Sequence, residues 1–161
     1  MSRIIPNEQS WVGFAATVAD LTAPTASEIT GAKVLTPYCI SINASTQGNT
    51  VPTPSIDTLF ETSIAGTVQA SFSADFYRDD GTGVGADLAW KTLPRKTKGV
   101  FLISRFGGSG TDQAPDSGDV IETWPVIVVS RTMSNMSNNT VMTFTMTASV
   151  PTEPNEAATV A

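Results

Sequence analysis

The sequence predicts a mainly β fold, a β-sandwich or partly closed barrel with one or two short helices. Residues 68–76 and 142–150 each alternate apolar and polar side chains, as expected of strands with one buried face. Residues 124–129 are nearly all apolar, which indicates a strand buried on both faces. Segments rich in Gly, Pro and Asn separate these runs, so we expect about seven or eight strands in all.

The polar faces of the two alternating segments are unusual. Seven of their eight side chains are uncharged Ser, Thr or Gln, and the eighth is Asp75. Exposed sheet edges are commonly protected by charge, especially by Lys, and neither face contains Lys or Arg. Such a smooth polar surface is better suited to lining or contacting something than to standing alone in water.

The N-terminal part contains an expected strand and an expected helix. Residues 11–16 are interpreted as an early strand or a docking arm, because their aromatic side chains are suited to packing. Residues 26–32 are expected to form a short helix. Thr25 and Glu28 have the spacing of a capping box, and Gly31 lies near the expected end.

The next segments are expected to be a strand, a long loop and an extended segment. Residues 35–43 predict the strand, with Cys39 as a buried structural thiol. Residues 44–55 are polar and contain two prolines, so we expect a loop, longer than usual hairpin connections and suited to contacts. Residues 56–65 are expected to be extended.

The middle of the chain predicts a turn, a short helix and a strand. Residues 78–81 carry a strong turn signal. Asp87 is expected to cap a helix over residues 88–92, which Pro94 ends because the residue before a proline disfavours helix. Residues 99–106 follow as a strand.

The C-terminal third predicts two more strands. Residues 107–118 are expected to be a flexible loop, and residues 120–131 a strand with Pro125 at a bulge or at its start. A turn-rich link precedes the strand over residues 142–150. We therefore expect one domain over residues 1–150, including an N-terminal arm over residues 1–23, and a flexible tail over residues 151–161.

Composition narrows the possible functions. The net charge of −6 argues against a nucleic-acid-binding protein but suits a surface that lets DNA pass without holding it. The chain has no histidine, the commonest general base and metal ligand, so an enzyme is disfavoured and no cofactor is expected. No signal peptide and no apolar run near the ~20 residues of a membrane helix are visible, so no membrane partner is expected.

Two Gly-rich segments resemble functional loops without matching them. Residues 79–87 lack the ligand spacing of a calcium loop and the Lys-Ser/Thr of a phosphate loop. Ser109 has no histidine and no Ser-x-x-Lys partner. Both segments are interpreted as solvated connections.

The charged residues are segregated along the chain. One interpretation is that they lie in solvated loops, where ion pairs contribute little. The other is that they form complementary patches that set the register between identical subunits. The basic group is Lys91, Arg95, Lys96 and Lys98; the acidic groups are Asp75, Asp79, Asp80 and Asp87, and Asp112, Asp116, Asp119 and Glu122.

Six segments in this order also resemble a known family. They are RIIPNEQSWVG at 3–13, NASTQGNTVPTP at 43–54, SFSADFYR at 71–78, GVFLISR at 99–105, WPV with SR at 124–131, and FTMT leading into VP at 144–151. The chain resembles the major tail, or tail tube, proteins of bacteriophages with long non-contractile tails, particularly those that infect actinobacteria. None of the segments is a catalytic motif, so the specificity comes from their order and number.

The resemblance implies a tail-tube-like β-sandwich or half-barrel that forms hexameric rings. The rings stack around the tape measure protein, the tail terminator and tail-tip proteins complete the tube, and DNA later passes through it. It implies a virion protein assembled in the host cytoplasm. The alternative is a virion-surface β-sandwich that serves as a binding or decoration module. The candidate interface residues are Asp79, Asp80, Arg95, Lys96 and Lys98, with Gln47, Asn49 and Pro52 of the expected loop and the N-terminal arm for contacts between rings.

Overall fold

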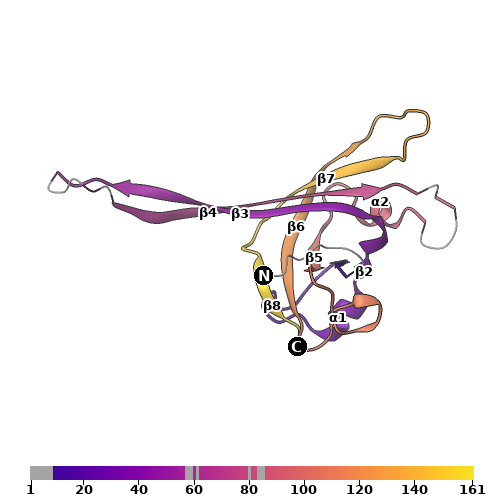
Figure 1. Ribbon diagram of the computed structural model, residues 1–161, viewed down its shortest axis with the longest axis horizontal. Coiled ribbons are helices and arrows are strands. Elements are labelled where there is room, and N and C mark those ends of the chain that lie inside the picture. The colour runs from indigo at the N-terminus through magenta and orange to yellow at the C-terminus, as the bar shows by residue number, and fades with distance from the viewer. Residues whose placement is uncertain (1–8, 57–59, 61, 80, 83–85) are drawn as a thin grey trace, which may run out of the picture.

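Eight antiparallel strands and two short α-helices make up the described part of the chain, residues 9–56, 60, 62–79, 81–82 and 86–161 of a computed structural model (Figure 1). None of the described helices is long and apolar enough to cross a membrane. The strands are β1 (Trp11–Ala15), β2 (Lys33–Val34), β3 (Cys39–Thr53), β4 (Thr62–Tyr77), β5 (Lys98–Ser104), β6 (Val120–Met133), β7 (Thr143–Ser149) and β8 (Asn155–Thr159). The helices are α1 (Ala26–Gly31) and α2 (Leu88–Thr92), with 3-10 turns η1 (Thr36–Tyr38) and η2 (Thr111–Gln113).

The strand order is β2-β1-β5-β6-β7-β4-β3, and β8 also pairs with β6. The long strand β6 joins two halves of the sheet, because its first half pairs with β5 and β8 and its second half pairs with β7. The four-strand panel is defined as residues 127–133 of β6, β7, residues 71–77 of β4 and residues 39–45 of β3. The remaining strands and α1 form the body.

Pro125 lies inside β6, which corrects the expectation of a bulge or a strand start. Val128 exchanges backbone hydrogen bonds with Lys96 and Thr97, on the β5 side of β6. Backbone groups alternate between the two edges of an antiparallel strand, so the nitrogen of Pro125 faces the other edge. On that edge the pairing of β6 with β8 ends at Thr123, and its pairing with β7 begins at Ile127. A residue without an N–H is tolerated in this gap.

The sheet folds back on itself. The ring of Phe72 on β4 stacks on Phe101 of β5 at 4.7 Å, although β7 and β6 separate these strands in the sheet. Phe101 also contacts Phe14 of β1 at 5.1 Å, and Trp124 of β6 lies 5.9 Å from Phe72. These contacts place panel and body face to face around one core. The expected mainly β architecture is confirmed, and the eight strands form an open antiparallel sheet.

Strand β1 is buried on both faces. Phe14 enters the main core, whereas Trp11 packs in a second cluster with Ile29 of α1 and with Val160. The predicted capping box starts α1: the Glu28 N–H donates to the hydroxyl of Thr25, and the Thr25 N–H donates to the Glu28 carboxylate at 2.8 Å. α1 thus covers the face of β1 that the panel leaves open.

The C-terminal segment differs from the expected flexible tail. Strand β8 pairs with β6, and Ala158 and Val160 are 0% and 2% exposed in the second cluster. The apolar signal is weak because alanines carry little side-chain area, so composition alone suggested a loose segment. Burial between β6 and α1 orders it.

The expected loop over residues 44–55 is mostly strand. β3 pairs with β4 from Cys39–Phe76 to Thr53–Thr62 and forms one long hairpin. β4 pairs with β7 only between Ser71 and Tyr77, so the rest of the hairpin extends far beyond the body (Figure 1). The strand expected from residue 35 begins only at Cys39, because η1 precedes it.

Candidate assembly surfaces

One face of the four-strand panel consists mainly of small polar side chains. Cross-strand pairs place Ser73 of β4 beside Asn43 of β3 and Thr147 of β7, and Thr147 lies opposite Ser130 of β6. Directly paired residues share a face, so each such row crosses all four strands. This polar face is formed by Ser41, Asn43, Ser45, Ser71, Ser73, Asp75, Ser130, Thr132, Thr143, Thr145, Thr147 and Ser149, and Gln47 and Gln69 continue it along the hairpin. Two larger side chains share the face, Ile127 opposite Ser149 and Tyr77 opposite Thr143.

Asp75 is the single charged side chain of the polar face. Its carboxylate accepts hydrogen bonds from the hydroxyls of Thr145 at 2.5 Å and Ser41 at 2.7 Å. These hydrogen bonds lower the pKa of Asp75 below its usual range. The polar face therefore carries a fixed negative charge at neutral pH and no positive charge.

The panel has two edges that are open in the subunit. At one edge lies β3, whose 15 residues include no charged side chain. At the other, β5 pairs with β6 only as far as Ile127, and no described strand lies beside Ser130–Met133 on that side. Unpaired N–H and C=O groups along such edges are templates for pairing with another chain.

The part of the hairpin beyond the panel carries uncovered apolar side chains. Val51 pairs across the hairpin with Ile64, and these residues are 48% and 58% exposed. Val68 is 62% exposed, although it continues the apolar row that is buried at Phe72. The predicted interface residues Gln47, Asn49 and Pro52 are all exposed along this part of β3.

The predicted basic interface residues lie together beside the open edge of β6. Arg95, Lys96 and Lys98 are exposed, and the Arg95 guanidinium donates to the carbonyl of Val129 at 3.2 Å. Lys96 has a positive φ of 71° and donates its N–H to Val128. We call residues 94–98 the basic turn.

The acidic candidates are not brought to that turn. Asp79 is exposed and its N–H donates to Asp87, whereas Asp80 lies outside the described residues. Asp87 was expected to cap α2, but it makes no capping hydrogen bond and has a left-handed φ of 55°. Its carboxylate instead accepts three hydrogen bonds from Arg78, two from Nε at 2.8 and 3.1 Å and one from Nη2 at 2.7 Å, in a pair whose side chains are 19% and 7% exposed.

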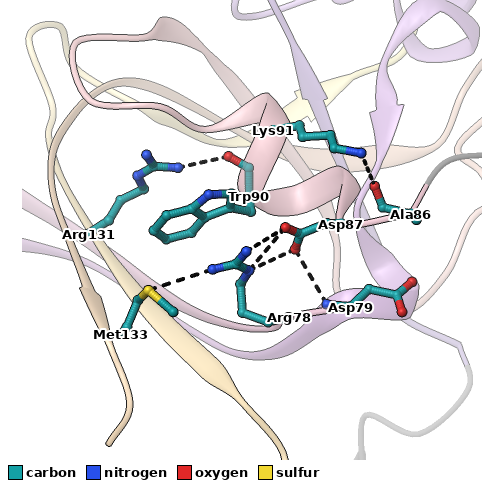
Figure 2. Close-up of polar contacts among 8 residues, drawn as sticks. All are labelled: Arg78, Asp79, Ala86, Asp87, Trp90, Lys91, Arg131 and Met133. Carbon is teal, nitrogen blue, oxygen red and sulfur yellow. Dashed lines mark hydrogen bonds and ion pairs between the residues drawn. The ribbon is translucent and has the colours of Figure 1, made fainter. Parts of the chain in front are cut away.

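Figure 2 shows that the Arg78 side chain, which binds Asp87, also lies beside the ring of Trp90. The Trp90 ring of α2 lies between two guanidinium groups, with Arg78 of β4 at 4.1 Å and Arg131 of β6 at 3.7 Å from the ring centroid. Arg131 also donates to the carbonyl of Trp90 at 2.8 Å. This cluster fixes α2 against the panel. The sequence shows only the local cap signal, because the partners come from three separate elements.

Comparisons with known proteins agree with this architecture. A family model described as phage tail tube protein matches residues 1–161, and no curated protein matches. A chain from the tail of an empty gene transfer agent particle, refined with C6 symmetry, has a TM-score of 0.57 and 15% identity over 96% of this chain and 100% of that one. A chain from the native gene transfer agent virion has a TM-score of 0.58 and 12% identity over 98% of this chain and 100% of that one. A chain from the anti-feeding prophage baseplate has a TM-score of 0.57 and 10% identity over 98% of this chain and 98% of that one. At these identities the structural likeness concerns the fold.

Proposed function

The chain belongs to the phage tail tube protein family, and we propose that its subunits join edge to edge into hexameric rings that stack into the tail tube. As a family member it is a structural protein of the virion tail rather than an enzyme. The observation that carries the proposal is the polar face flanked by two open strand edges.

Edge-to-edge joining suits the direction of the strands. The panel has four strands that are all antiparallel to their neighbours, so β3 and β6 run in opposite directions at its two edges. When the β3 edge of one subunit meets the β6 edge of the next, the new pair is again antiparallel. A ring of identical panels thus closes without a change of strand pattern and without leaving an open edge.

The size of such a ring is suitable for a DNA conduit. Six panels supply about 24 strands, and a spacing of ~4.8 Å with a tilt of about 40° gives a backbone circle of roughly 45–50 Å in diameter. Side chains on the inside reduce this by about 10 Å. The remaining lumen is wider than a DNA duplex.

The polar face is proposed to line the lumen, because the other face of the panel is occupied by the core. Without Lys or Arg it offers no counter-charge to phosphates, and Asp75 repels them. The tape measure protein and then DNA would pass along it without being held. The tail terminator and tail-tip proteins would complete the two ends of the tube.

Stacking of rings is proposed to use the two ends of β3. The hairpin extends from one end, and at the other a groove of about 510 Å³ is lined by Ile40, Ile42, Ile103 and Phe106, among others. Contact between the hairpin of one ring and the groove region of the next is head-to-tail, which naturally builds filaments. In this arrangement Gln47, Asn49 and Pro52 contribute to contacts between rings. Of the expected N-terminal arm, residues 1–8 lie outside the described residues, and residues 11–15 are buried in the subunit as β1 and are not available for such contacts.

Electron microscopy of purified protein tests the proposal. Wild-type protein should form rings or hollow tubes, alone or after addition of tail-tip components. A variant in which residues 51–64 are replaced by Asn-Gly should keep the circular dichroism of the wild type but form no tubes. Tubes of normal length from this variant would refute the role of the hairpin. A wild-type protein that stays monomeric with tail-tip components and binds glycans would instead support the binding-module alternative.

A further inference from the structure

A cleft lies beneath the hairpin where it leaves the panel. Its volume is about 610 Å³, and its lining includes Leu21, Thr46, Val68, Glu153 and Glu156. The Glu156 carboxylate accepts a hydrogen bond from the hydroxyl of Thr46 at 3.0 Å, so the C-terminal segment is in contact with β3. The cleft therefore borders the open β3 edge of the panel.

The two glutamates form no ion pair in the described part of the subunit. The ion pairs there are Arg78–Asp87 and Arg105–Glu122, and neither includes Glu153 or Glu156. Arg105 attracts Glu156 at longer range, but its hydrogen bonds go to Glu122. The cleft thus presents negative charge beside apolar side chains.

The basic turn presents positive charge at the other edge of the panel, beside β6. Arg95, Lys96 and Lys98 are exposed, and they form no ion pair among the residues that the structure describes. The turn is held against Val128 and Val129 by backbone and guanidinium hydrogen bonds, so its position relative to the β6 edge is fixed. Three cations thus lie at the edge that would face a neighbouring subunit.

Building on the proposed ring, we infer that the basic turn of one subunit docks at the Glu153–Glu156 cleft of its neighbour. The two features lie at similar heights on the panel: Val128 is in register with Ala148, Ala148 with Phe72, and Phe72 with Ala44, two residues from Thr46. Strand stagger in a barrel shifts the neighbour by roughly five residues per panel at a tilt of about 40°, or about 16 Å along the strands. The two-residue offset from Ala44 to Thr46 and the reach of an Arg or Lys side chain, about two residues, together span most of this shift when it runs toward Thr46.

This contact would lie outside the lumen. Thr46 pairs with Ala70, on the panel face that leads to the core, and not on the polar face. Charged pairs at the margin of an interface mainly select orientation and register rather than supply affinity. The contact therefore explains how the uncharged β3 edge, which could slip along its partner strand, pairs in a single register.

Charge reversal tests the contact. The variant E153K/E156K, and separately R95E/K96E, should remain folded monomers by circular dichroism but lose rings and tubes under the electron microscope. Combining all four substitutions should restore tubes, because the pairing is re-created with exchanged signs. The control D112K/D116K makes the same charge change on an exposed segment outside the cleft and should assemble like the wild type.

The outcomes separate the contact from the ring itself. Normal tubes from E153K/E156K, or no rescue by the combined variant when each parent variant is folded, would overturn the docking contact while leaving the ring intact. If the wild type and the D112K/D116K control both stay monomeric with tail-tip components, the ring proposal fails and the contact fails with it.

Discussion

Replacing Phe72 with alanine tests whether ring packing holds the four-strand panel on the body. Phe72 is 1% exposed and lies 4.7 Å from Phe101 and 5.9 Å from Trp124. Removing a buried phenylalanine costs about 3–5 kcal/mol. We expect the upper part of that range, about 4–5 kcal/mol, because two rigid rings cannot collapse into the cavity. A domain of this size loses about 2–4 °C in Tm per kcal/mol, so Tm should fall by about 8–20 °C.

Urea denaturation of the monomer, followed by circular dichroism, measures this loss of stability. The urea concentration at the midpoint of unfolding should fall, and the dependence of the unfolding free energy on urea concentration should not change. The matched control is V68A, which lies on the same strand and in the same apolar row but is 62% exposed, and which should change stability by less than about 0.5 kcal/mol. A double-mutant cycle of F72A with F101A should give a coupling of about 0.5–1.5 kcal/mol. A loss below about 1.5 kcal/mol for F72A would refute the face-to-face packing of panel and body.

Two further predictions concern ionisable groups. Hydrogen bonds from Arg78 lower the pKa of Asp87 from its ordinary value of 3.8. The ion pair therefore stabilises the fold above that pH and is lost as pH falls through the lower folded-state pKa. Acid should then destabilise the wild type more than D87N in urea titrations, and equal acid sensitivity would contradict this role. Burial raises the pKa of the half-buried Cys39 thiol to about 11, so at pH 8 it should react with iodoacetamide far more slowly than in the urea-unfolded chain. Equal rates would show an accessible, unperturbed thiol.

The parts of the fold that the sequence predicts well are those whose signal comes from burial within the subunit. Phe72, Phe76, Phe144 and Met146 alternate with polar residues because one side of each strand faces the core, and they are all at most 1% exposed. The capping box of α1 is also local, since both partners lie within one turn. Such features depend on neighbours in the chain or on a single buried face.

The hairpin could not be predicted in this way. Residues 47–53 of β3 lie outside the core, so no alternation of apolar and polar residues marks them as strand, and Pro52 and Gly48 suggest a loop. Their strand conformation comes from backbone pairing with β4 instead. The cluster of Trp90 with Arg78 and Arg131 was also missed, because it depends on three elements that meet only in the folded chain.

The unusual surface chemistry is understandable if the subunit is built for pairing that happens only in the assembly. A 15-residue edge strand without charge would invite uncontrolled pairing in a protein that stayed monomeric. The net charge of −6 opposes contact between subunits, but ions screen it beyond about 8 Å at physiological salt. Repulsion at that range slows encounters without selecting among registers. Selection must then come from charges close to the edges, and the basic turn and the Glu153–Glu156 cleft are suitably placed for it. High salt should accordingly weaken selection between registers more than it weakens strand pairing itself.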